Sequence, residues 1–273
     1  MTDAGRDRRA PVVAPSAEAW SAPGGDTGAL VLHGFTGNPT AMRPLGLALA
    51  GTGAAVEMPR LPGHGTHWRE LAATTWHDWA REAGAALDRL RERTRSVTVV
   101  GLSGGGTLAL RLAQIRPADV SALVLINPPI IYRSPLRPVG GLLARVVPTF
   151  PGLGNDIAQP DADELPYDRV PVRAAMSLFE LQDLVRADLA KVRTPTLVLT
   201  SRVDHTVPTE NSTIILDRIA SPDKQQVWLE RSFHVATLDY DADLIAERTL
   251  AFMAEHGTAP EVGDGNTSRG AGA

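Results

Sequence analysis

The stretch that decides the fold is Ser96-Val97-Thr98-Val99-Val100-Gly101-Leu102-Ser103-Gly104-Gly105, a β-branched apolar run that leads into the pattern G-x-S-x-G. The apolar run predicts a buried strand, and residues 106–115 predict a helix. A serine on such a strand-to-helix turn is held in a strained backbone conformation, and side chains two residues before or after it would collide with neighbouring segments. Gly101 and Gly105 occupy those two places. The stretch therefore predicts an exposed, nucleophilic Ser103.

Apolar runs alternate with helical patterns along the rest of the chain. Further strands are predicted at 29–32, 54–58, 122–126, 196–200 and 227–229, and helices at 76–93, 171–185, 210–219 and 242–255. Most of the strands lack polar alternation, which is typical of a parallel sheet buried on both faces. The interruption of roughly 60 residues after the fourth strand is too long for a loop in a compact domain. We therefore predict an α/β fold with a mostly parallel central sheet, helices on both faces, and a small helical cap inserted at about residues 130–192.

The bulk composition fits one large domain and argues against several classes of protein. The chain has 273 residues, of which 43% are hydrophobic, enough to bury a sizeable core. A formal net charge of −4 gives no reason to expect a nucleic-acid partner. The sequence has no cysteine and no apolar run of about 18 residues, so we expect no disulfide framework, thiolate metal site or integral membrane segment. With no recognisable secretory signal, these features fit a cytoplasmic location.

The two ends of the chain offer little to bury. Residues 257–273 are rich in glycine and alanine, and the first residues carry arginines without a sustained apolar run. We predict a flexible N-terminal tail over 1–25, the folded domain over 26–256, and a disordered C-terminal tail over 257–273.

A nucleophilic serine needs a general base, and the base needs an acid that orients it. After a serine on this kind of turn, the chain order is Ser, then Asp or Glu, then His. Asp204 follows the strand 196–200 in a polar loop, although taken alone it could equally be a turn or helix-capping residue. Of the histidines beyond Asp204, His205 is adjacent to the acid and His256 is expected to be solvated at the end of the last helix. His234, which follows the last strand, is left as the base.

The negative charge that develops during attack on a carbonyl needs backbone donors. The N–H of Gly104, directly after the nucleophile, is one candidate. The other is the N–H of Phe35 in the loop after the first strand, where the alternative is a glycine-rich turn with Phe35 in the core. We expect the Phe35 ring, Ile130, Val207 and Val235 to line the acyl-binding pocket.

Neither a metal nor a cofactor is expected. His64 lies in the stretch Leu61-Pro62-Gly63-His64-Gly65, where a ring that anchors the glycine turn by hydrogen bonds is favoured over a metal ligand. His67 is nearby, but no clear third ligand accompanies them. The sequence has no phosphate-binding G-x-x-x-x-G-K-[ST] loop and no G-x-G-x-x-G after the first strand.

Taken together, these motifs resemble the bacterial carboxylesterase and monoacylglycerol lipase branch of the α/β-hydrolases. The resemblance runs from about Ala29 to Phe252, and the segments that carry it are His33–Gly37, Pro62–Gly65, Gly101–Gly105, the Asp204 loop and Ser232–Asp239. It implies the α/β-hydrolase fold with a small cap and ester hydrolysis through an acyl-enzyme. It also implies a Ser103, Asp204 and His234 triad, with Phe35 and Gly104 as the oxyanion hole.

The chain departs from the pattern of this family at two places. Relatives often have a bulkier residue after the nucleophile, so Gly104 predicts a roomier acyl site. The region before Ala29 is short, which predicts that the first strands are reduced to a piece near residues 18–21.

The preferred function is hydrolysis of short- to medium-chain acyl esters, monoacylglycerols among them, by a monomer or small homo-oligomer. A thioesterase, an amidase or a carbon–carbon hydrolase of the same superfamily would share the triad. An epoxide hydrolase or dehalogenase is disfavoured, because those enzymes carry Asp where this chain has Ser103. From another class, a catalytically silent ligand-binding module stays open, since fold alone does not guarantee activity.

Overall fold

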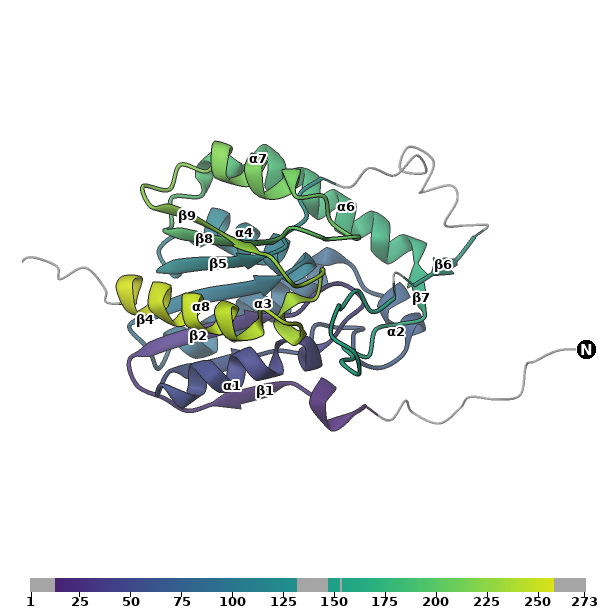
Figure 1. The fold of residues 1–273 in the computed structure, drawn as a ribbon, viewed down its shortest axis with the longest axis horizontal. Helices are drawn as coiled ribbons and strands as arrows, with labels where there is room; N and C mark the ends of the chain where they lie inside the picture. Colours follow the sequence, from purple (N-terminus) through teal and green to yellow (C-terminus); the bar gives the residue numbers. More distant parts are fainter. Residues whose placement is uncertain (1–12, 132–146, 153, 258–273) are drawn as a thin grey trace, which may run out of the picture.

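A seven-stranded sheet forms the centre of the computed structural model, which describes residues 13–131, 147–152 and 154–257 (Figure 1). The strands are β1 (Trp20–Ala22), β2 (Thr27–Leu32), β3 (Ala55–Met58), β4 (Ser96–Leu102), β5 (Ala122–Ile126), β8 (Thr196–Ser201) and β9 (Lys224–Leu229). Their order in the sheet is β1-β3-β2-β4-β5-β8-β9. All neighbours pair in parallel except β1, which is antiparallel to β3. The predicted α/β fold class is confirmed.

Two hydrophobic clusters cover the two faces of this sheet, because the apolar strands present side chains alternately to either side. In β4, Val97 and Val99 belong to one cluster, while Val100 and Leu102 belong to the other. The first cluster is closed by α3 (Trp76–Arg91), α4 (Gly104–Ile115), α6 (Val172–Ala187) and α7 (Glu210–Arg218). The second cluster is closed by α1 (Arg43–Gly51) and α8 (Ala242–His256).

Helix α3 shows how local sequence sets these elements. A capping box opens it, in which the Asp78 carboxylate accepts a hydrogen bond from the Thr75 backbone N–H at 3.0 Å. One turn of the helix then places Trp76 and Trp79 against the sheet, where Trp79 is 2% exposed. The helix in turn packs beneath the loop that contains Phe35, whose ring centroid lies 5.6 Å from that of Trp79.

The domain begins earlier than the sequence suggests. The predicted tail over 1–25 is too long, because a 3₁₀ turn (Pro15–Ala17) is followed by β1, which joins the sheet at Trp20. Strand β1 overlaps the piece near residues 18–21 to which the sequence predicts that the first strands are reduced. The remainder of the predicted tails, residues 1–12 and 258–273, lies outside the described residues.

The cap also differs from the prediction of a purely helical insertion. Strands β6 (Thr149–Pro151) and β7 (Arg169–Pro171) form a separate antiparallel pair, and the helix α6 follows directly. Each strand ends in a proline, a residue that argues against a strand in sequence but is tolerated at an edge. Two further helices, α1 and the short α2 (Trp68–Ala72), are likewise absent from the sequence-based prediction.

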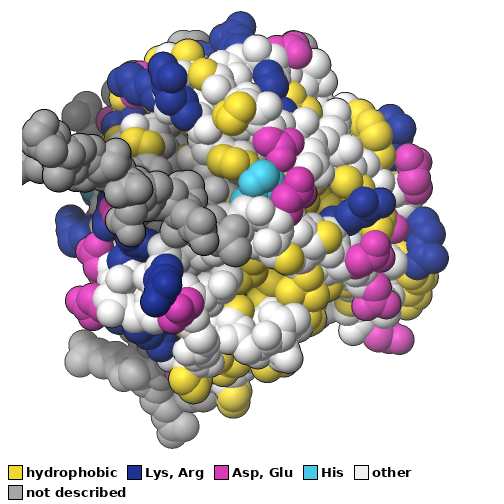
Figure 2. Space-filling model, turned by 90° about the vertical axis from the view of Figure 1, so that its left-hand side faces the viewer, with side chains coloured by type: hydrophobic (Ala, Val, Ile, Leu, Met, Phe, Trp, Pro, Cys, Tyr) yellow, Lys and Arg dark blue, Asp and Glu magenta, His cyan; other side chains and the backbone are white. Residues whose placement is uncertain are grey.

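No helix among the described residues is long and apolar enough to cross a membrane. On the face shown in Figure 2, acidic and basic side chains are interspersed with hydrophobic ones rather than separated into regions of one sign.

Candidate active site

Ser103 lies at the turn between β4 and α4, with backbone angles of φ 52° and ψ −124°. Its N–H donates to the Ile126 carbonyl at 2.8 Å, which fixes the turn to the neighbouring strand. A side chain at Gly101 would collide with the Gly105 backbone, and one at Gly105 would collide with the Leu32 carbonyl. Because such backbone atoms cannot move independently, glycine is required at both places, as the sequence predicts.

The structure brings Ser103, His234 and Asp204 into one chain of hydrogen bonds. His234 Nε2 lies 2.9 Å from Ser103 Oγ, and His234 Nδ1 lies 2.8 Å from Asp204 Oδ2. The other carboxylate oxygen, Asp204 Oδ1, accepts from the N–H groups of Thr206 and Val207 at 2.8 and 2.7 Å. Since a carboxylate only accepts, the Asp204 contact assigns the proton to Nδ1 and leaves Nε2 able to accept the serine proton.

The charges around His234 favour its protonated form. Burial works to lower the pKa of the imidazole, but the hydrogen bond and the charge of Asp204 raise it, and the Glu164 and Asp156 carboxylates add to the rise. The net shift of the His234 pKa is upward. A base that holds a proton more tightly is suited to taking one from a serine hydroxyl.

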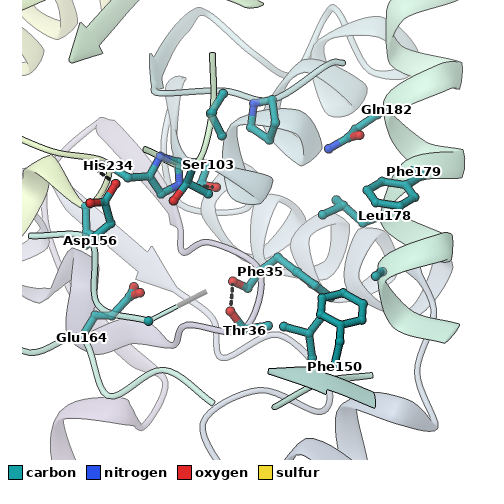
Figure 3. A pocket seen from close by; sticks show the side chains of 17 residues that line it. Phe35, Thr36, Ser103, Phe150, Asp156, Glu164, Leu178, Phe179, Gln182 and His234 are labelled. Atoms are coloured by element: carbon teal, nitrogen blue, oxygen red, sulfur yellow. Dashed lines mark hydrogen bonds between the residues drawn. The ribbon is translucent and has the colours of Figure 1, made fainter. Parts of the chain in front are cut away.

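Phe35 lies against the residue that follows Ser103. An ideal Cβ on Gly104 would lie 3.1 Å from the Phe35 nitrogen, so the Phe35 backbone is close to the start of α4. Gly104 is the first residue of α4, where a helical N–H has no acceptor within its own helix. Phe35 is held by Thr36, which adopts a left-handed φ of 65° and donates from Oγ1 to the Phe35 carbonyl at 2.6 Å (Figure 3). Backbone N–H groups beside a nucleophile are the kind of donor that an oxyanion needs.

A cavity of about 740 Å³, including its open mouth, lies beside Ser103. In Figure 3, Asp156, Glu164 and His234 lie on one side of the cavity, which we call its polar half. Phe150, Leu178 and Phe179 lie across from them, together with Gln182, and we call this side the apolar half.

Three of the four residues predicted to bind substrate line this cavity, namely Phe35, Val207 and Val235. The prediction for Ile130 is wrong. Its side chain is fully buried in the hydrophobic core, and its N–H donates to Asn211 Oδ1 at 2.8 Å. The turn after β5 directs Ile130 inward, and Pro129 lines the cavity instead.

The sequence predicts that Gly104 widens the acyl pocket, but in the structure it does not. It lines a separate small void of about 190 Å³, and Phe35 and Leu178 lie between this void and the main cavity. The other residues that line the void are His33, Leu61, His64, Trp79 and Leu108. The space left by the missing side chain therefore lies beneath the Phe35 ring, outside the cavity next to Ser103.

His64 has the structural role that the sequence favours. The ring is 1% exposed and its Nδ1 donates to the Pro62 carbonyl at 3.1 Å. His33 Nε2 accepts from the Leu61 N–H at 3.1 Å, which ties this turn to the Phe35 loop. Burial lowers the pKa of His64 to about 3 and that of His33 to about 4, so both rings are neutral at pH 7.

His256 is not solvated, contrary to the sequence-based expectation. Its side chain is 17% exposed, its ring packs against Phe252, and its Nε2 lies 2.9 Å from Asp223 Oδ2. Among the described residues, Asp223, Glu255 and His256 also form the group of acids and histidine close enough to share a metal ion. None of them lines the cavity beside Ser103.

Three acids near the site were not predicted. Asp156 Oδ1 accepts from His205 Nδ1 at 2.8 Å, and its Oδ2 accepts from the N–H groups of His205 and His234 at 3.2 and 3.3 Å. Asp239 accepts from the Ala158 and Phe233 N–H groups at 2.7 and 2.9 Å.

The third acid, Glu164, is 9% exposed and lines the polar half of the cavity. Burial raises the pKa of its carboxyl to about 7; the His234 charge opposes this rise, and Asp163 and Asp156 add to it. The only signal in the sequence is that Glu164 ends an acidic run, Asp161–Glu164, and such runs are usually solvated.

Comparisons with known proteins give a family match, two curated relatives and a solved structure. Residues 27–241 match the family model described as serine aminopeptidase, S33. The chain is 40% identical to a thermostable monoacylglycerol lipase of Bacillus sp. (strain H-257) over 89% of its length and 97% of that protein. It is 32% identical to a carboxylesterase of Bacillus subtilis (strain 168), over 84% of its length and 93% of that protein. A solved structure reported for the metagenome-derived lipolytic enzymes LipS and LipT superposes with a TM-score of 0.87 at 39% identity, covering 90% of this chain and all of that one.

Proposed function

Because the chain belongs to the serine aminopeptidase S33 family of α/β-hydrolases and is an ester hydrolase, we propose that it cleaves carboxylic esters with Ser103 as its nucleophile. His234 is the general base, and Asp204 orients it. The observation that carries this proposal is the unbroken chain of hydrogen bonds from Ser103 Oγ through the imidazole to the Asp204 carboxylate.

The proposed reaction has two halves that use the same residues. His234 Nε2 takes the proton of Ser103 Oγ as that oxygen attacks the ester carbon, while the N–H groups of Phe35 and Gly104 stabilise the oxyanion. The imidazolium then gives its proton to the leaving alcohol, and an acyl-enzyme remains on Ser103. A water molecule, deprotonated by His234, attacks the acyl-enzyme and releases the carboxylic acid.

The shape of the cavity supports an acyl chain of short to medium length. Phe35, Phe150 and Leu178 offer an apolar wall against which such a chain can be buried. Monoacylglycerols are the proposed substrates among such esters, since a relative at 40% identity is named a monoacylglycerol lipase. A cytoplasmic location and a monomeric or small homo-oligomeric state stay predictions from the sequence.

Replacement of the nucleophile tests the proposal. Ser103→Ala should lower the turnover of p-nitrophenyl butyrate by about 10⁴-fold or more, with an unchanged urea unfolding midpoint. A fluorophosphonate probe should add to Ser103 in the wild-type protein and not in the variant, which mass spectrometry of peptides would show. Turnover retained in the folded variant would overturn the assignment.

A series of p-nitrophenyl esters from acetate to palmitate tests the proposed chain length. The value of kcat/KM should peak at short to medium chains and fall for palmitate, the longest chain of the series. A maximum at palmitate would contradict the proposed acyl range while leaving the ester chemistry intact. Thioesters and amides of the same acids, measured alongside, would reveal a preference for another bond.

A further inference from the structure

One polar side chain lies in the apolar face that the cap helix α6 turns toward the cavity. The residues of α6 that line the cavity are spaced by three and four positions, which places them on one face of the helix. They are Ala175, Leu178, Phe179 and Gln182. Figure 3 shows Gln182 reaching into the cavity from the same helix as Leu178 and Phe179. Gln182 therefore stands where helical spacing predicts an apolar residue.

The amide of Gln182 is buried without a hydrogen-bond partner. The residue is 2% exposed, and within the described part of the chain no hydrogen bond reaches its Oε1. By contrast Gln114, a buried glutamine of α4, donates from Nε2 to the Val185 carbonyl at 2.9 Å. An amide oxygen that has lost its water without gaining a donor costs stability. A residue that weakens the fold in this way, and lines the cavity beside Ser103, is a candidate for contact with substrate.

The acyl chain is the part of the substrate that meets Gln182. In the proposed reaction His234 gives its proton to the alcohol oxygen, so the alcohol lies on the His234 side of the cavity and the acyl chain extends away from it. Gln182 lies on the opposite side, in the apolar half with Leu178 and Phe179. An alkyl chain in this half offers the amide neither a donor nor an acceptor, whereas a hydroxyl group on the chain offers both.

Building on the proposed ester hydrolysis, we propose that Gln182 is a specificity-determining residue that selects acyl chains carrying a hydroxyl group. The preferred substrates are monoacylglycerols of hydroxylated medium-chain acids, compared with the unsubstituted chain of the same length. The hydroxyl donates to Gln182 Oε1 or accepts from its Nε2, because the terminal torsion of a glutamine has a broad distribution and can turn either atom toward the chain. Among the described residues, no hydrogen bond of this amide has to be broken first.

The preference should depend on where the hydroxyl lies along the chain. A hydroxyl on the carbon beside Gln182 gains a hydrogen bond, and a site built to bind a hydroxyl in this way discriminates strongly against a chain that lacks it. A hydroxyl on another carbon would instead face Phe150, Leu178 or Phe179 and lose its own water without compensation. The wild-type preference should therefore have a maximum at one carbon and fall below the unsubstituted chain at carbons that lie against these apolar side chains.

The experiment compares mono-octanoylglycerol with its hydroxyoctanoyl analogues on the full-length enzyme. The hydroxyl is moved carbon by carbon from the β-carbon to the chain end, and glycerol release gives kcat/KM for each ester. At the best position, the ratio of kcat/KM for the hydroxylated to the plain ester should be about tenfold higher for the wild type than for Gln182→Met. Methionine keeps the length of the side chain and removes the amide, so the variant should favour the plain ester.

Two further measurements separate substrate recognition from a structural role. Gln225→Met makes the same chemical change at an exposed position of β9 that does not line the cavity, and its ratios should equal those of the wild type. The urea unfolding midpoint of Gln182→Met should equal or exceed that of the wild type, since the change removes a buried amide without a partner. A marked fall in that midpoint, or failure of the variant to fold, would show that the amide supports the fold and would overturn the proposal.

Each remaining outcome decides a separate claim. A wild-type ratio that is level along the chain, or equal ratios in the wild type and Gln182→Met, would overturn the selection of hydroxylated chains, while turnover of mono-octanoylglycerol upheld the proposed function. Absence of turnover for every ester of the series would overturn the proposed hydrolysis of monoacylglycerols, and this inference with it.

Discussion

The turn that holds Ser103 and the loop that holds His234 are fixed in different ways. In the Ser103 turn, backbone packs against backbone. Glycines let α4 approach β2, and the Ser103 N–H donates to a carbonyl of β5. The His234 loop is tied instead by carboxylates, through Asp156 from the cap and Asp239 from the loop itself. Ser103 is thus held by contacts between uncharged backbone groups, whereas the position of His234 depends on the carboxyl side chains of Asp156 and Asp239.

The contacts that tie the His234 loop to the cap form a continuous seam. We define this cap–base seam as the hydrogen bonds of Asp156 and Asp239 to the backbone of residues 158–159, 205 and 233–234. Asp239 is 3% exposed and accepts four N–H groups, from Ala158, Gln159, Phe233 and Tyr240. The position of His234 therefore depends on single side chains in a way that the position of Ser103 does not.

Gly105→Ala tests the turn and should have the largest effect. The new Cβ would meet the Leu32 and His33 carbonyls, which cannot move without shifting β2 and the Phe35 loop that follows it. We expect a loss of about 3 kcal/mol in the free energy of unfolding and loss of most ester hydrolysis. Urea denaturation and p-nitrophenyl butyrate turnover would measure both.

Gly51→Ala is the control for this variant, since nothing lies within 4 Å of its ideal Cβ at the end of α1. It should leave stability unchanged or raise it slightly. An unfolding midpoint for Gly105→Ala equal to that of the wild type would refute the claim that backbone contact holds the turn.

Asp239→Asn tests the seam and should have an intermediate effect. An amide retains one accepting oxygen, so two of the four backbone N–H groups would face an NH₂ group and lose their acceptor. We expect a loss of about 2 kcal/mol in stability and a lower kcat, because His234 adjoins the released segment. Asp243→Asn, an exposed change on α8, should alter neither quantity by a measurable amount. Unchanged kcat in a destabilised Asp239→Asn would mean that the seam stabilises the fold without positioning the base.

The difference between the two regions also explains what the sequence could predict. The β4–α4 turn was predictable because its two signals are local. One is the apolar run of β4, whose alternate residues pack into the two hydrophobic clusters, and the other is the pair of glycines at fixed offsets from Ser103. Asp204 and His234 followed from chain order and from the end positions of β8 and β9. These residues needed no knowledge of distant contacts.

The seam could not be predicted, because its partners are far apart in the chain. Asp156 lies 78 residues from His234, and Asp239 lies 81 residues from Ala158. Nothing in the sequence distinguishes these two aspartates from solvated ones. The wrong prediction that Ile130 lines the cavity also results from a distant contact. The Ile130 N–H donates to Asn211 Oδ1, and Asn211 lies 81 residues further along the chain.

Asp156→Asn should have the smallest effect. It distinguishes the effect of the Asp156 charge on His234 from the effect of the hydrogen bonds that Asp156 makes within the seam. The variant keeps a side chain of the same size, so we expect kcat/KM near its optimum to fall only about threefold. The informative readout is the acid limb of the pH profile, where activity is lost as His234 becomes protonated. The Asp156 charge helps to raise the pKa of His234, so its removal should lower that pKa and move the acid limb to lower pH.

His205→Ala is the matched control, because it removes the exposed ring that contacts Asp156 and leaves the carboxylate in place. The acid limb of this control should not move to lower pH. A limb that stayed in place in Asp156→Asn would show that the seam acts on His234 through backbone position alone.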